Sequence, residues 1–155
     1  MSRSISTIVL LASMTLACPV EALAWGDEGH MVVGLVARHF LSPAVRTQVE
    51  ALLAGDTSKL VKPVDIPDEA TWADKYRDSD RYSTKKRYYG TRQWHFVDIE
   101  VAAPDLDAAC NHHPPLPAGT HASAGPAQDC VVDKIEQFAA ELALPHLSLH
   151  ERRMA

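Results

Sequence analysis

Residues 25–40 have the sequence WGDEGHMVVGLVARHF, and this stretch indicates the fold class of the chain. From Asp27 to Phe40 the apolar residues recur three and four positions apart, which is the spacing of one face of an α-helix. We therefore expect a helix over residues 27–40 whose apolar face packs against a core. That face consists of Met31, Val32, Leu35, Val36 and Phe40.

The residues in front of this helix have the pattern of an export signal. Arg3 supplies a positive charge, residues 5–17 are mostly apolar, and residues 22–24 have the A-x-A pattern of a cleavage site. The apolar run is shorter than the roughly 20 residues that a membrane span needs. We therefore expect a signal peptide at residues 1–24, a mature chain at residues 25–155, and a secreted or periplasmic protein that is not held in a membrane.

The charge of the chain restricts how it could hold a nucleic acid. Its formal net charge is −5, whereas domains that bind nucleic acid through general electrostatic attraction are usually basic. Loss of the signal would remove one cation and one anion, which leaves this charge unchanged. Any phosphate chemistry must therefore depend on local positive charge, such as a bound metal ion.

The cysteines favour a disulfide in the mature chain. Cys18 lies inside the predicted signal, and a lipoprotein anchored there is disfavoured because the residue three positions before it does not fit a lipoprotein signal. Cys110 and Cys130 remain, and an even pair in an exported protein most simply forms a disulfide. Closing a loop of this size stabilises a fold by roughly 3 kcal/mol. Zinc thiolates are the weaker alternative because no C-x-x-C pair exists.

The middle of the mature chain is also predicted to be helical. Ser42 followed by Pro43 is typical of a helix start, and Gly55 is expected to end that helix as a C-terminal cap. A third helix is expected over residues 67–77, and residues 92–101 are expected to be extended or irregular. Residues 102–129 are expected to form a loop because prolines interrupt any regular element.

The C-terminal part gives two further helix signals. A fourth helix is expected over residues 131–144, with an inner stripe of Val131, Ile135, Phe138 and Leu142. Residues 148–151 have the pattern of a capping box, which announces another helix. Few residues follow it, and short helices gain little stability on their own. A frayed tail is therefore the alternative there.

Eight histidines in 155 residues make metal binding worth considering. His30 follows the predicted mature start closely, and His95 lies among apolar residues in WHFVD. Asp74 lies in WADKYR, in the third expected helix. From the residues alone, a buried structural role is the open alternative to metal ligation for all three. The histidines of the proline-rich loop and the tail are expected to be solvated, namely His112, His113, His121, His146 and His150.

Three motifs in this order resemble a known family. W-G-x-x-G-H at a processed N-terminus, then W-A-D-x-x-R, then W-H-F-V-D, are similar to the secreted fungal, plant and bacterial nucleases that use three zinc ions. Members of that family cleave single-stranded DNA and RNA and remove 3′-phosphates from nucleotides. The resemblance implies a mainly helical, all-α fold of the phospholipase C and zinc nuclease type, of which this chain covers roughly the N-terminal half.

The resemblance implies a role for each motif residue. The α-amine and carbonyl oxygen of Trp25 would bind one zinc beside His30, and Asp74 and His95 would bind another. Asp74 would also orient the attacking water, and Arg77 would donate to a phosphate oxygen. Without the resemblance, a surface salt bridge is the simpler interpretation of Arg77.

The resemblance also implies a base-binding site. Phe96 would stack on a base and Asp98 would accept hydrogen bonds from the base edge. Stacking on an unpaired base would select single-stranded DNA or RNA, or nucleotides, as the substrate. The alternative for Phe96 is a place in the core. No protein partner is predicted.

The sequence departs from the family after Phe138. The helix with His-x-x-x-Asp and the further ligands that follow it in the family are not found there. We therefore expect a truncated member with incomplete sites and weak or absent activity. Two alternatives stay open, namely a zinc-dependent phospholipase C and an exported remnant that is not an enzyme.

Overall fold

A computed structural model describes residues 26–155 of the chain, and these residues form an all-α fold. The predicted signal peptide and Trp25 lie outside the described residues. The elements, in chain order, are α2 (Asp27–Phe40), α3 (Pro43–Leu53), α4 (Ile66–Glu69), α5 (Trp72–Asp78), α6 (Lys86–Thr91), the 3₁₀ helix η1 (Arg92–His95), α7 (Leu106–Ala109), the 3₁₀ helix η2 (Ala122–Ala124), α8 (Val131–Leu142) and α9 (Leu149–Met154). Within this range no helix is both long and apolar enough to cross a membrane.

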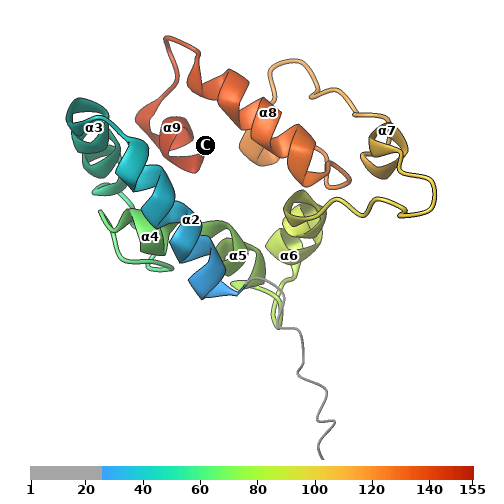
Figure 1. Cartoon of the computed structure of the whole chain (residues 1–155), viewed down its shortest axis with the longest axis horizontal. Helices are drawn as coiled ribbons and strands as arrows, with labels where there is room; N and C mark the ends of the chain where they lie inside the picture. Colours follow the sequence, from blue (N-terminus) through green and yellow to red (C-terminus); the bar gives the residue numbers. More distant parts are fainter. Residues whose placement is uncertain (1–25) are drawn as a thin grey trace, which may run out of the picture.

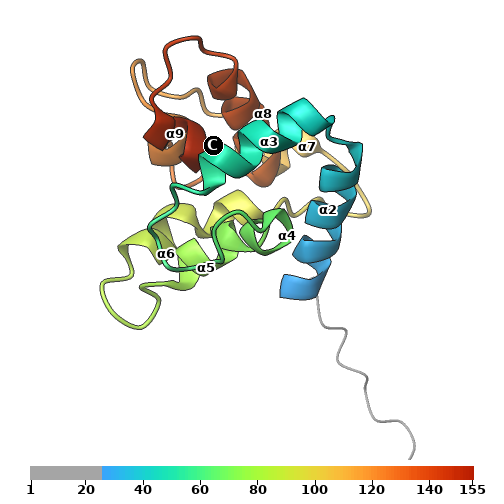
Figure 2. The ribbon, with the colours of Figure 1, turned by 90° about the vertical axis from the view of Figure 1, so that its left-hand side faces the viewer.

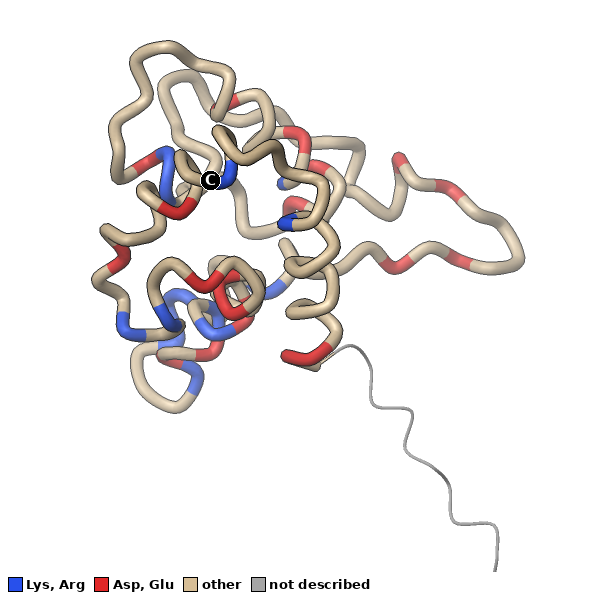
Figure 3. Tube along the Cα trace, turned by 60° about the vertical axis from the view of Figure 1, so that its left-hand side comes forward, with Lys and Arg blue, Asp and Glu red and all other residues tan. Residues whose placement is uncertain are grey.

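The helices form an open arrangement in which sequence-distant elements meet (Figures 1 and 2). Helix α2 lies against α4, α5 lies against α6, and the C-terminal α9 lies against α3. Helix α8 contacts η1 and η2, which brings the C-terminal third of the chain next to the middle. The excursion between η1 and α8 carries α7 outward, and residues 96–130 contain acidic residues but no lysine or arginine (Figure 3).

The first two helices begin where their sequences predict. Helix α2 covers residues 27–40, and α3 begins at Pro43 after Ser42, whose side chain accepts from the backbone N–H of Val45 at 3.3 Å. The expected C-terminal cap at Gly55 is wrong, because Gly55, which follows the cap residue Ala54, does not adopt the left-handed conformation of a glycine cap.

The third expected helix is divided. Residues 66–69 form α4 and residues 72–78 form α5. Between them Thr71 is buried, and its hydroxyl donates to the backbone carbonyl of Asp68 at 2.7 Å. Threonine side chains compete with the backbone for such carbonyls, which accounts for the break. Within α5, Trp72 and Tyr76 lie four positions apart and stack with ring centroids 4.7 Å apart.

The apolar faces of α2 and α8 are not buried by the described residues, which contradicts the expected inner stripes. On α2, Val32, Val36 and Phe40 are 56%, 53% and 80% exposed. On α8, Ile135 is 64% exposed. Helix periodicity predicts which residues share a face, but the elements that cover this face are set by contacts between distant segments.

Helix α8 instead buries a polar face. Lys134 is 3% exposed, pairs with Asp129 at 3.0 Å, and donates to the Ala122 carbonyl at 2.8 Å. Its ammonium also lies 3.9 Å from the ring centroid of Trp94. Burial lowers the pKa of Lys134, and the Asp129 carboxylate opposes this shift. The buried ammonium of Lys134 is stabilised by these partners, and its contacts hold α8 against the segment that precedes it.

Candidate metal centre

His30 lies at the start of α2 with one ring nitrogen already occupied. Its Nδ1 is 3.1 Å from the carbonyl oxygen of Gly26. Because a carbonyl only accepts, this contact places the proton on Nδ1 and leaves the lone pair on Nε2. That Nε2 lies 3.6 Å from Oδ2 of Asp74. A backbone carbonyl that fixes the tautomer is the usual second partner of a metal-binding histidine.

A glycine sets the distance between α2 and the helices that carry Asp74. Gly34 is buried, and a Cβ atom added to it would lie 3.0 Å from the Cα of Pro67. It would also lie 3.1 Å from the carbonyl oxygen of Ile66. The backbones of α2 and α4 therefore approach closely at Gly34, and this places His30 opposite the first turn of α5.

Asp74 lies between two histidines. Its Oδ1 is 3.1 Å from Nδ1 of His95, while its Oδ2 faces His30. His95 ends η1, and its side chain is 14% exposed. Burial lowers the pKa of His95, although the charge of Asp74 opposes that shift. A lowered pKa keeps the imidazole neutral near pH 7, which is the form that can ligate a metal.

Arg77 is held by two carboxylates. Its Nη1 donates to Oδ1 of Asp74 at 2.6 Å, and its Nε and Nη2 donate to Asp78 at 2.9 and 2.8 Å. The hydrogen bond to Asp78 raises the pKa of Arg77, and the same bond lowers the pKa of Asp78. Arg77 thus faces the same carboxylate as the two imidazoles.

Phe96 and Asp98 border one shallow pocket. Phe96 is 54% exposed, so the alternative that places it in the core is wrong. The pocket has a volume of about 60 Å³ and is also lined by Asn111 and Gln128. Ligand pockets usually measure about 300–1,000 Å³. The described residues therefore form a shallow recess here rather than an enclosed ligand pocket.

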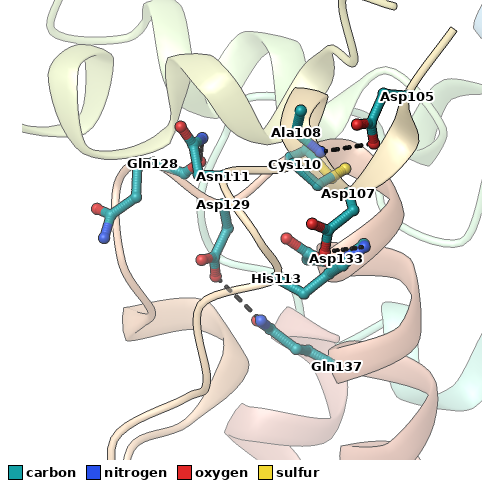
Figure 4. Close-up of a disulfide and its surroundings, with 11 residues drawn as sticks. Asp105, Asp107, Ala108, Cys110, Asn111, His113, Gln128, Asp129, Asp133 and Gln137 are labelled. Atoms are coloured by element: carbon teal, nitrogen blue, oxygen red, sulfur yellow. Dashed lines mark hydrogen bonds and ion pairs between the residues drawn. A yellow bond between two sulfur atoms is a disulfide. The ribbon is translucent and has the colours of Figure 1, made fainter.

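The expected disulfide is present between Cys110 and Cys130, with the sulfurs 2.09 Å apart (Figure 4). Ligand atoms of Cys110, His113 and Asp133 lie within 4.8 Å of one another. The Cys110 sulfur is bonded to Cys130, however, so it offers no thiolate to a metal.

The histidines of the proline-rich loop are more engaged than expected. Nδ1 of His113 is 2.5 Å from Oδ1 of Asp133, which is buried on α8, and the hydrogen bond to Asp133 raises the pKa of His113. His121 lies 2.5 Å from Glu141 and 2.5 Å from Glu151. His112 keeps an exposed side chain but pairs with Asp107. The acidic residues on the polar face of α8, Asp133 and Glu141, could have indicated these contacts from the sequence.

Comparisons with known proteins identify the family of the chain. The S1/P1 Nuclease family model matches residues 25–155. Nuclease S1 of Aspergillus oryzae is 28% identical over 105 residues, which cover 64% of this chain and 33% of that protein. Nuclease P1 of Penicillium citrinum is 29% identical over 82 residues, which cover 52% of this chain and 26% of that protein. The chain thus spans about a third or less of the length of these relatives. No solved structure matches the chain at a significant level.

Proposed function

Because the chain belongs to the S1/P1 nuclease family, we propose that it carries part of a zinc-dependent site that hydrolyses phosphodiester bonds of single-stranded DNA and RNA, and 3′-nucleotides. The main support is the position of Asp74 between His30 and His95, with Arg77 on the same carboxylate. The family match favours nucleic acid over a phospholipid as the substrate.

The donor set suits zinc. His30 and His95 offer imidazole nitrogens and Asp74 offers two oxygens, which are ligand types that Zn²⁺ binds in proteins. Each imidazole approaches a different oxygen of Asp74, which supports assigning Asp74 and His95 to one zinc and His30 to a neighbouring one. Bound zinc lowers the pKa of a coordinated water and offsets charge on a phosphate. Asp74 would then orient that water by accepting its hydrogen bond.

The proposal includes export and cleavage after residue 24. Only a free α-amine at Trp25 could bind a metal, because the amide nitrogen of an uncut precursor has no available lone pair. Gly26, the next residue in the chain, contacts the ring of His30 through its carbonyl oxygen. This contact supports assigning Trp25 and His30 to the same ion in a secreted or periplasmic protein.

Arg77 can reach a phosphate without leaving its partners. A guanidinium carries five N–H donors, and three of them are used by Asp74 and Asp78. The remaining donors lie on the two terminal nitrogens, so they can contact a phosphate oxygen while Asp74 keeps the group in place. We assign Arg77 this role, with Phe96 stacking on a base and Asp98 accepting from its edge.

We expect weak zinc affinity and weak hydrolysis from this chain by itself. Among residues 26–155, the cluster around Asp74 gathers three ligand side chains, whereas each tetrahedral zinc needs four ligands. Water molecules or additional polypeptide would have to complete each ion's coordination. Zinc binding is therefore a more sensitive readout of the site than turnover.

Calorimetric zinc titration tests the proposal. We expect residues 25–155, produced with Trp25 as the first residue, to bind zinc more tightly than the uncut chain of residues 1–155. Asp74→Asn should weaken zinc binding by tenfold or more, because it removes the negative charge of the carboxylate that lies between His30 and His95. Zinc-dependent hydrolysis of a single-stranded oligonucleotide should fall in parallel.

Glu100→Gln is the matched control, since Glu100 is an exposed carboxylate that accepts a local hydrogen bond from the backbone N–H of Ala102. The proposal fails if the mature chain binds no zinc, or if Asp74→Asn and Glu100→Gln give the same affinity as the parent.

A further inference from the structure

The segment between Asp74 and His95 is basic although the chain is acidic. Residues 75–92 hold seven of the 15 lysines and arginines but two of the 20 acidic residues. They also hold all four tyrosines of the chain. Figure 3 shows lysine and arginine positions gathered around α5, α6 and the loop that joins them. This is local positive charge directly beside the candidate metal centre.

Several of these cations have no acidic partner. Lys85, Lys86, Arg87 and Arg92 are exposed, and within residues 26–155 no carboxylate oxygen lies within 4.0 Å of their charged groups. Arg77, by contrast, forms ion pairs with Asp74 and Asp78. Unpaired exposed cations attract phosphates and release counterions when they bind them.

Tyrosine rings alternate with these cations. Tyr82 is 92% exposed and Tyr89 is 54% exposed, so each side chain presents part of its ring to solvent. The guanidinium of Arg81 lies 5.8 Å from the ring centroid of Tyr82, and that of Arg92 lies 5.3 Å from Tyr89. Exposed aromatic rings set among cations are the components of surfaces that bind single strands.

The loop that presents Tyr82 is internally braced. Both carboxylate oxygens of Asp80 accept hydrogen bonds from the start of α6, at 3.0 Å from the backbone N–H groups of Arg87 and Tyr88. Asp80 also accepts from the hydroxyl of Thr84 at 2.7 Å. Desolvation raises the pKa of Asp80, but these bonds together outweigh it, so the pKa lies below its usual value. The loop projects from the fold beside α5 and α6 (Figure 2). Tyr82 in this loop is 92% exposed, and the braced backbone lowers the entropic cost of binding a ligand there.

We propose that residues 79–92 form a second binding surface for single-stranded nucleic acid, distinct from the base pocket at Phe96. Tyr82 and Tyr89 stack on unpaired bases, and Lys85, Lys86 and Arg92 contact the phosphates. That the bound nucleic-acid strand continues toward Asp74 rests on the proposed function. Binding of the strand to this surface, by contrast, requires no metal. A duplex is a poor ligand because its base faces are hidden.

Fluorescence anisotropy of a labelled oligothymidylate, recorded with the full chain in EDTA, tests the surface. Tyr82→Ala should weaken binding between about 5-fold and about 150-fold, while Tyr82→Phe should retain it. Log affinity against log salt should have a slope of roughly −2 for three phosphate contacts, and Lys86→Ala should reduce that slope by about 0.7. Lys62→Ala is the matched control, because Lys62 is an exposed lysine outside the segment.

The result separates this inference from the proposed function, since EDTA removes zinc and stops hydrolysis. If Asp74→Asn loses zinc binding but the anisotropy of the bound oligonucleotide is unchanged, the metal site has been lost and the binding surface has not. The surface proposal is overturned if the parent chain does not bind the oligonucleotide, or if Tyr82→Ala binds like the parent. It is also overturned if heparin and duplex DNA compete as well as the single strand, because attraction between charges would then be sufficient.

Discussion

Gly34 is the residue on which the spacing of α2 and α4 depends, and its substitution is the first prediction. An added Cβ would meet the backbone of Pro67 and Ile66 at 3.0 and 3.1 Å, and backbone atoms cannot move aside cheaply. Gly34→Ala should therefore destabilise the chain by about 1–3 kcal/mol, as overpacking of a close contact does. Urea denaturation would measure it, and zinc affinity should fall as His30 is displaced from Asp74.

Gly90 provides the matched control. It lies within α6, and nothing lies within 4 Å of where its Cβ would be. Gly90→Ala should stabilise the chain by roughly 0.5–1 kcal/mol, because alanine loses less backbone entropy in a helix. If both substitutions shift the urea midpoint in the same direction, the close α2–α4 contact does not set the stability.

Other individual residues show what the sequence could not predict. Gly55 was expected as the C-terminal cap of a helix, but its missing side chain instead makes room for Arg153, whose Nη2 lies 2.0 Å from where a Cβ would be. That contact joins positions almost a hundred residues apart, so no local pattern announces it. The chemical identities of His30, Asp74 and His95 were readable from their motifs, whereas the approach of both imidazoles to one carboxylate required the fold.

At the scale of elements, α9 illustrates a helix held by its surroundings. Its capping box is complete, as the sequence predicts, since Ser148 accepts from the Glu151 backbone and Glu151 accepts from that of Ser148. Arg152 also donates to the carbonyls of Leu142 and Leu144 at 3.0 and 3.1 Å. Because a helix this short is unstable alone, these bonds and the contact with α3 account for it, and the frayed-tail alternative is wrong.

His121 links α9 to α8 and makes this docking sensitive to pH. It lies between Glu141 of α8 and Glu151 of α9, and the hydrogen bond to Glu141 raises its pKa. A raised histidine pKa stabilises the folded state fully below the unfolded value of about 6.5. That stabilisation is lost as the pH rises through the higher folded value. Hydrogen-exchange protection of residues 149–155 should therefore decrease from pH 6 to pH 8.

His121→Gln should abolish this pH dependence, because glutamine cannot take up the proton. His112→Gln is the control, since His112 pairs with Asp107 near α7 and away from α9. Equal loss of protection with pH in the parent and His121→Gln would show that the histidine does not couple the two helices.

The helices themselves were predictable to different extents. Helices α2 and α3 follow from local spacing and from the Ser42-Pro43 start, and α8 appears as expected although it ends at Leu142. The short α6 and α7 were missed. Helix α7 had a readable signal, because Asp105 caps it by accepting from the Ala108 backbone at 3.0 Å. Helix α6 did not, since its start is bonded by Asp80 from outside the helix.

At the scale of the whole molecule, the exposed apolar surface is large and the buried hydrophobic core is small. Among residues 26–155, the hydrophobic residues that are fully buried are Cys110, Ala122 and Cys130. The apolar sides of α2 and α8 face outward in the same range. The sequence pattern of these helices is that of core-packing elements, so periodicity predicted the faces correctly and could not predict whether anything covers them.

The exposed face of α2 leads to the last prediction. Soluble monomers rarely expose a contiguous apolar patch larger than a few hundred Å², and a larger one promotes association. Residues 25–155 should therefore bind the dye ANS at pH 7 and show concentration-dependent association in sedimentation velocity. Val32→Ser with Val36→Ser should reduce both signals without loss of helical circular dichroism, because both side chains are more than half exposed. Val101→Ser, at a loop position that is 93% exposed, should change neither. A mature chain that is monomeric and dye-free at all concentrations would mean that α2 is covered in solution.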